Sequence, residues 1–224
     1  MISKLKTHIL MATLAGGMFA ATAATAATVT VSYQESSIFG TPDQSSLVLF
    51  ATPTTLGLAN AGPFRLNAGA GLGNFVAFCV DLSKSMASGH TYETSAASAH
   101  GAQVDNAIDR LFTSAYAGIN SAVKGAAFQV ALWEIITDTG NGAYSLASGN
   151  FRALSYQNVM QQANSYLAAL SGAGTGGYDL TFLNSDTSQN LVTATPSPVP
   201  VPAAAGMLGL GMLSFFGLRR RKKS

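Results

Sequence analysis

In residues 28–80 and 178–193, apolar and polar residues alternate or apolar residues form short runs. This pattern predicts β-strands at residues 28–33, 47–50, 64–66, 74–80, 178–183 and 191–193. Alternation is typical of strands because successive side chains point to opposite faces of a sheet. The clearest of these segments is 74–80, which is followed by Asp81.

Between the two groups of strands, the apolar spacing changes to that of helices. One helical face is formed by Val104, Ile108, Leu111, Phe112 and Ala115. Asn120 or Ser121 can cap a second helix, which should end in the turn-forming residues 138–142. A third helix fits residues 156–170 behind a Ser155 cap, before Gly172 and Gly174.

The order of strands, helices and strands favours an α+β fold over alternating strand–helix units. We expect a mostly antiparallel β core, shaped as a sandwich or barrel, with a central insertion of two to three helices. With 224 residues, the chain is long enough for one domain of ordinary size and additional end segments. This domain is predicted to span residues 27–195.

Composition and charge narrow the range of functions. Charged residues make up only 10% of the chain, and seven of its twelve basic residues lie at the two ends. The remaining five basic residues face all ten acidic ones, which leaves the central region at −5. A nucleic-acid partner is therefore not expected, because such surfaces are built on basic stripes. One cysteine and three histidines predict no metal site, and no cofactor motif is present.

The N-terminus has the three parts of a secretory signal peptide at residues 1–26. Lys4 and Lys6 precede an apolar stretch at 9–21, and Ala24-Thr25-Ala26 has the small residues that signal peptidase accepts. The triplet 21–23 is a competing cleavage site, and an uncleaved anchor helix is the alternative. The pattern predicts export.

The C-terminus combines a proline-rich spacer at 196–202, an uncharged apolar segment at 203–218 and a basic tail at 219–224. The apolar segment predicts a transmembrane helix, slightly short for a bilayer. The positive-inside rule then places the tail in the cytoplasm and the central region outside. The basic residues of the tail are Arg219, Arg220, Arg221, Lys222 and Lys223.

This layout resembles a VPLPA-CTERM signal, a variant of the PEP-CTERM sorting signals of Gram-negative bacteria. The motif is formed by Val199, Pro200, Val201, Pro202 and Ala203, with Val201 at the position of the usual leucine. The resemblance implies cleavage by an exosortase, an inner-membrane intermediate, and transfer to the cell surface or extracellular matrix. A permanent single-pass anchor is the alternative.

Cys79 is the leading candidate for chemistry, since an unpaired cysteine in an exported protein needs an explanation. It can be an inert core residue, half of an intermolecular disulfide, a catalytic nucleophile or part of an internal cross-link. As a nucleophile it would need His90, expected in a loop, or His100 as base. Asp81 and Asp138 could act as an acid–base pair, but no sequence motif positions them for it.

Two short motifs favour the cross-link. Phe78-Cys79-Val80-Asp81 on a strand precedes Phe128-Gln129-Val130-Ala131-Leu132-Trp133 on a helix by about fifty residues. Together they resemble the thioester domains of bacterial surface adhesins, which pair an aromatic-Cys-Ile/Val-Asp strand with a Thr-Gln-x-Ala-Ile/Leu-Trp helix. Phe128 replaces the usual threonine.

The resemblance implies that Cys79 attacks the carboxamide of Gln129, that ammonia leaves, and that the thioester later acylates an amine or hydroxyl on a surface or matrix target. Phe78, Phe128, Leu132 and Trp133 are the expected walls of a dry pocket. Such a protein makes one acyl transfer per molecule and is not an enzyme. A non-reactive matrix protein and a secreted cysteine hydrolase are the alternative functions.

Overall fold

The computed structural model describes residues 27–34, 37–39, 45–69, 71–138 and 143–198. The predicted signal peptide, sorting motif, apolar segment and basic tail lie outside these ranges. Among the helices within them, none combines the length and the apolar character needed to cross a bilayer.

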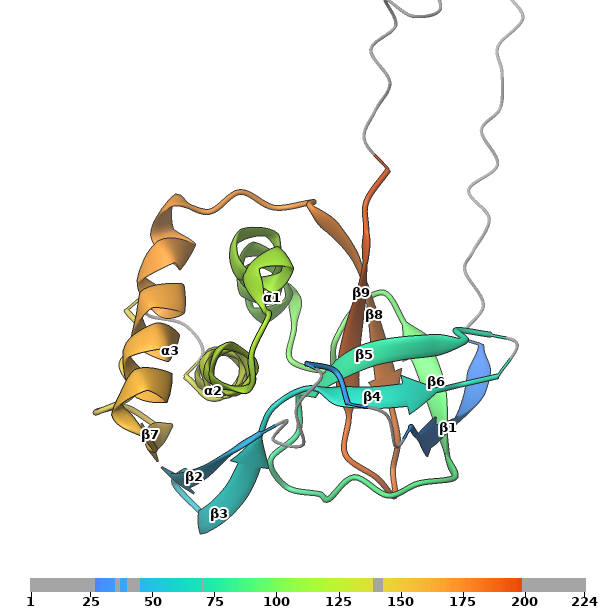
Figure 1. Cartoon of the computed structure of the whole chain (residues 1–224), viewed down its shortest axis with the longest axis horizontal. Helices are drawn as coiled ribbons and strands as arrows, with labels where there is room; N and C mark the ends of the chain where they lie inside the picture. Colours follow the sequence, from blue (N-terminus) through green and yellow to red (C-terminus); the bar gives the residue numbers. More distant parts are fainter. Residues whose placement is uncertain (1–26, 35–36, 40–44, 70, 139–142, 199–224) are drawn as a thin grey trace, which may run out of the picture.

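Six strands close an antiparallel barrel. In spatial order they are β1 (Thr28–Tyr33), β4 (Phe64–Asn67), β5 (Asn74–Cys79), β9 (Leu191–Pro196), β8 (Tyr178–Asn184) and β6 (His90–Ser95), as Figure 1 shows. The strands alternate between interior and exterior, so that residues such as Val31, Leu66 and Tyr92 fill the barrel. Closure leaves each of these six strands paired on both sides.

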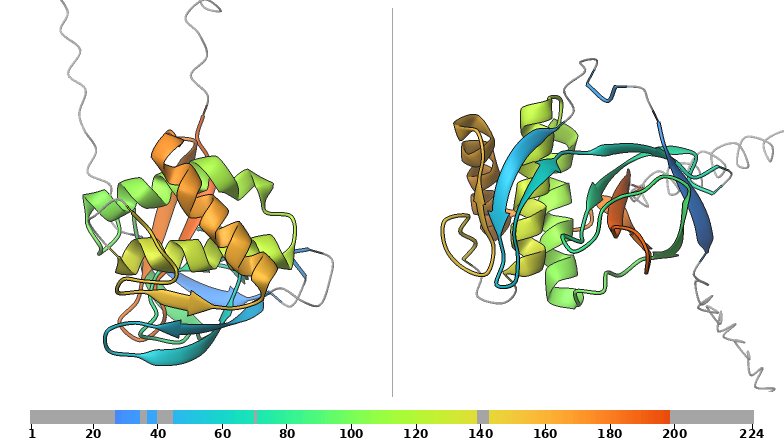
Figure 2. Two further views of the ribbon diagram at one scale, coloured as in Figure 1. Left: turned by 90° about the vertical axis from the view of Figure 1, so that its left-hand side faces the viewer. Right: turned by 90° about the horizontal axis from the view of Figure 1, so that it is seen from below.

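A second sheet of three strands lies beside the helices, in the order β3 (Leu56–Ala61), β2 (Ser46–Ala51) and β7 (Arg152–Leu154). Its inner face buries Val48 and Phe50. Figure 2 shows this sheet and the helices on one side of the molecule and the barrel on the other. Helix α2 (Ala122–Thr137) contacts strands β2 and β3 of this sheet and strand β5 of the barrel.

Helix α2 is the centre of the helical layer and contacts α1 (Ala102–Ala115), α3 (Gln157–Ala169) and strands of both sheets. Its residues 125–136 are all buried, whereas α1 and α3 each bury one face. The Ser121 hydroxyl caps α2 by accepting from the Lys124 N–H. A side chain at Gly125 would lie 2.8 Å from Pro63, so the helix approaches the β3–β4 turn closely there.

The structure confirms the α+β prediction of a mostly antiparallel β core with a central insertion of three helices. Two local predictions were wrong. Ser155 does not cap α3, because Tyr156 occupies the N-cap position and the Ser155 hydroxyl donates to the Leu47 carbonyl. His90 is not in a loop, because it begins β6 and pairs with Val31 on β1.

Candidate functional site

Cys79 and Gln129 meet where the barrel touches the helical layer. Cys79 is the last residue of β5, and Gln129 lies in the middle of α2. The Cys79 N–H donates to Gln129 Oε1 and Gln129 Nε2 donates to the Cys79 carbonyl, both at 2.8 Å. Both residues are about 1% exposed. Residues 50 positions apart are thus joined by two buried hydrogen bonds.

The register of the barrel explains why a glutamine is needed there. Strand β4 begins at Phe64, opposite Ala77, so β5 continues past it to Cys79. On the other side of β5, Cys79 pairs with Leu191 on β9. The carboxamide of Gln129 therefore takes the place of a strand peptide and satisfies the buried N–H and C=O of Cys79.

The Cys79 thiol is held by the backbone of Asp81, two residues further along the chain. Sγ donates to the Asp81 carbonyl at 2.9 Å and accepts from the Asp81 N–H at 3.2 Å. Burial raises the pKa of the thiol to about 12, although the Trp133 side chain and the Asp81 backbone lower it in part. The free thiol is therefore neutral at physiological pH, unlike the thiolate of a cysteine hydrolase.

The carboxamide carbon of Gln129 is close to Cys79. A C=O bond is about 1.2 Å long, so Cδ lies within about 4 Å of the Cys79 nitrogen. The same N–H points at Oε1, where negative charge would develop if the carbonyl were attacked. The geometry therefore suits acyl chemistry at this carboxamide.

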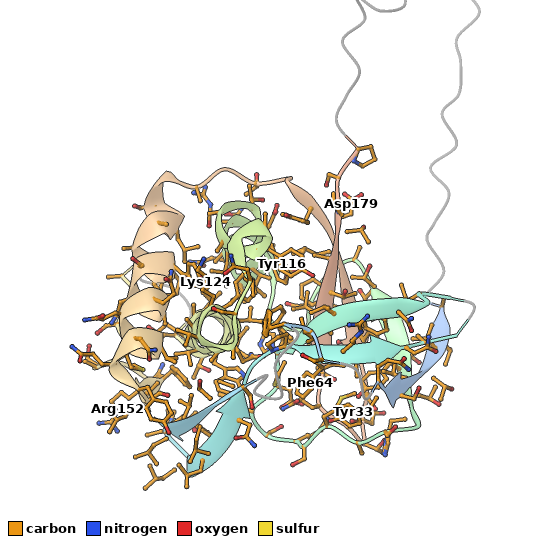
Figure 3. The ribbon with its side chains drawn as sticks, in the orientation of Figure 1. Tyr33, Phe64, Tyr116, Lys124, Arg152 and Asp179 are labelled. Carbon is orange, nitrogen blue, oxygen red and sulfur yellow. The ribbon has the colours of Figure 1, made fainter. Side chains whose placement is uncertain are left out.

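A cavity of about 340 Å³ adjoins both residues. Trp133 on α2, Phe50 on β2, and Tyr33 and Phe64 on the barrel line it together with Cys79 and Gln129. Tyr33 and Phe64 are labelled in Figure 3, and their ring centroids lie 6.2 Å apart. The Tyr33 side of the cavity reaches the surface, since this residue is 43% exposed.

Phe78 and Phe128 belong to an aromatic cluster behind the site. Their ring centroids lie 4.6 Å apart, and Phe112 lies 5.0 Å from Phe128. Phe78 points away from Cys79 because neighbouring strand residues face opposite sides. Leu132 is fully buried in the same core. Trp133 is thus the predicted wall that meets Cys79 and Gln129 at the cavity, and the two phenylalanines support β5 and α2.

The other candidate residues have structural partners. The His90 Nδ1 bonds with the Thr187 hydroxyl, and His100 Nε2 bonds with the Val80 carbonyl. Asp81 accepts from Ser83, whereas Asp138 accepts from the backbone of 150 and 151. Within the described ranges, no group of His, Cys, Asp and Glu could hold a metal ion.

Sequence reasoning missed Glu134, a fully buried carboxyl next to Trp133. Its Oε1 accepts from the Ser145 N–H at 2.6 Å, which holds the chain after α2 against the helix. Burial raises the pKa of this carboxyl to about 7, and the charge of Asp138 adds to the shift. An acidic residue inside the apolar run 130–136 is the signal that could have identified it.

We predict that the free energy of unfolding falls as pH rises from 4.5 to about 7, because of Glu134. The folded pKa of about 7 exceeds the ordinary value of 4.5, so the folded state binds this proton more tightly. The contribution is complete below pH 4.5 and is lost by about pH 7, a change of about 3 kcal/mol. Urea denaturation should show that the free energy of unfolding differs less between pH 5 and pH 8 for Glu134→Gln than for the parent. Exposed Glu93→Gln is the control, and an unchanged difference in Glu134→Gln would contradict this assignment.

No family model matches the chain, and no curated protein matches it. One solved structure that resembles it is the N-terminal domain of the Streptococcus pyogenes pilus tip adhesin Cpa. The match has 17% sequence identity and a TM-score of 0.39, and covers 74% of this chain and 99% of that one.

Proposed function

We propose that this protein is an exported cell-surface protein in which Cys79 and Gln129 form an internal thioester that captures a partner covalently. The observation that supports this most directly is the reciprocal pair of 2.8 Å hydrogen bonds that presents the Gln129 carboxamide to Cys79. The pair is buried, as a reactive acyl group requires.

Formation of the bond balances without a cofactor. The Cys79 sulfur attacks Cδ of Gln129, the C–N bond breaks, and the thiol proton leaves with the nitrogen as ammonia. The Cys79 N–H stabilises the oxygen as charge develops on it. The product keeps this hydrogen bond, because only Nε2 is lost.

Capture is a second acyl transfer. An amine on a partner attacks Cδ, the C–S bond breaks, and the amine proton passes to the sulfur, which regenerates the Cys79 thiol. The resulting amide does not dissociate on a binding timescale, so the tether needs no large contact area. Each molecule reacts once, and the protein is accordingly proposed to be a binding protein and not an enzyme.

The segments outside the described ranges complete the proposal. A cleaved signal peptide and an exosortase-processed C-terminus would take the domain through an inner-membrane intermediate to the cell surface or matrix. Immunoblotting of cell fractions, with and without deletion of residues 199–224, tests this part. Loss of surface protein on deletion is expected, and unchanged surface display would contradict the sorting assignment.

A non-reactive matrix protein is the second candidate. The same two hydrogen bonds satisfy the buried backbone of Cys79 without any covalent bond, which gives Gln129 a structural role. A covalent bond and a structural hydrogen-bond pair predict different masses.

The intact mass of the purified protein distinguishes these two functions. We expect the parent to be lighter than its sequence by one ammonia and the Cys79→Ala variant to have its full sequence mass. Added methylamine should then increase the mass of the parent by one methylamine and expose one thiol. Full sequence mass in both proteins, with an alkylatable thiol in the parent after unfolding, would favour the non-reactive protein.

A further inference from the structure

Gln189 carries a buried acceptor atom and lines the cavity beside Cys79 and Gln129. It lies in the loop between β8 and β9 and lines this cavity. Its Nε2 donates to the carbonyls of Asp81 and Lys84, both at 3.1 Å. Since both partners are acceptors, these bonds fix which end of the amide carries oxygen. Oε1 is left buried and without a hydrogen-bond partner among the described residues.

Trp133 carries a buried donor atom. Its side chain is 2% exposed, and its Nε1 makes no hydrogen bond of acceptable geometry within the described part of the chain. Its side chain lines the same cavity as Cys79. A buried polar atom without a partner is unfavourable, and a bound group could pair with both of these atoms.

We propose that Gln189 is the residue that binds and orients the attacking amine, and that Trp133 supports the departing sulfur; this rests on the thioester proposed above. Gln189 Oε1 accepts an N–H of the neutral amine while the nitrogen lone pair attacks Cδ of Gln129. As the C–S bond breaks, the indole N–H and the Asp81 N–H stabilise the sulfur, which then takes up the amine proton. The products are an amide at Gln129 and a thiol at Cys79.

The amine is expected to come from a partner. Lys84 also lines the cavity, but its Nζ donates to the Ser185 carbonyl at 2.8 Å and lies 3.7 Å from the Asp81 carboxylate. Both contacts hold Lys84 Nζ against oxygen atoms of Ser185 and Asp81. The nucleophile class assigned to the site is therefore a primary amine, such as a lysine side chain, on another molecule.

The test compares two nucleophiles by intact mass. Methylamine carries N–H groups on its attacking atom, whereas the thiolate of 2-mercaptoethanol carries no hydrogen there. Gln189→Leu should slow the reaction with methylamine about tenfold relative to that with 2-mercaptoethanol, the effect of one hydrogen bond. Trp133→Phe should slow both reactions in similar proportion because it acts on the shared leaving group.

Controls separate this inference from the function on which it rests. Gln161→Leu, on the exposed face of α3, should leave both rates unchanged. Gln189→Met, of similar size to the parent, should show the same selectivity as Gln189→Leu. In each variant, a mass one ammonia below the sequence mass verifies that the thioester has formed. An unchanged rate ratio in thioester-containing variants, or no thioester in either variant, would overturn the role of Gln189 alone. Full sequence mass in the parent would overturn both proposals.

Discussion

Replacement of Gln129 by glutamate is expected to abolish covalent capture and to reduce the free energy of unfolding by about 3–5 kcal/mol at pH 8. A carboxylate does not release ammonia and is a poor acyl donor to a thiol, so no thioester should form. The ionised group also has no hydrogen to donate to the Cys79 carbonyl, which Gln129 Nε2 contacts at 2.8 Å. Two acceptors would then face each other in a site shielded from water.

The sign of the pH dependence follows from the same contact. A protonated carboxyl can donate to the Cys79 carbonyl and accept from the Cys79 N–H, as the amide does. Burial and the facing carbonyl should raise the pKa of the introduced group, so the variant should lose stability as pH increases above the value of the unfolded chain. Urea denaturation at pH 5 and pH 8, alongside intact mass, measures both effects.

Gln161→Glu is the matched control for this variant. Gln161 lies on the exposed face of α3, where the same change introduces the same charge in water. It should keep the mass deficit and change stability by less than about 0.5 kcal/mol. A Gln129→Glu protein that equals this control at pH 8 would show that the buried hydrogen bonds at Cys79 contribute little.

The sequence predicted those elements whose periodicity reflects burial. Residues 28–33 alternate because one face of β1 fills the barrel, and the spacing of Val104 and Ile108 marks the buried face of α1. Strand β3 was missed because Leu56 and Leu58 are exposed, so the apolar positions do not mark its buried side. Strand β7 has three residues and forms only by pairing with β2, about a hundred positions away.

The candidate site also combines residues that the sequence predicts with one that it does not. Cys79 and Gln129 were identified from two short motifs, and their contact needs a strand end and a helix that the sequence also indicates. Gln189 has no motif, because its position depends on bonds to Asp81 and Lys84 more than a hundred residues away. A polar residue in a loop carries no local sign that barrel closure buries one of its atoms.

Phe128→Ala is expected to reduce the free energy of unfolding by about 3–5 kcal/mol, the range for a large buried aromatic residue. Phe128 is fully buried, with its ring centroid 4.6 Å from Phe78 and 5.0 Å from Phe112. Its removal leaves a cavity that these rings cannot fill without shifting, and it also removes aromatic contacts that add to burial. Urea denaturation measures the change, and Tyr156→Ala, at a residue 69% exposed, is the aromatic control.

The effect of Phe128 should extend to the site because the aromatic cluster and the Cys79–Gln129 pair lie on the same strand and helix. Phe78 precedes Cys79 on β5 and Phe128 precedes Gln129 on α2, so the contact between the two rings fixes how the helix meets the strand. Phe128→Thr, which introduces the residue found in the adhesin motif, should also be destabilised by about 3 kcal/mol, since it leaves a cavity and buries a hydroxyl. A Phe128→Thr protein as stable as the parent would mean that the rings around this position adjust easily. In that case the alignment of Gln129 with Cys79 would rest on their two hydrogen bonds alone.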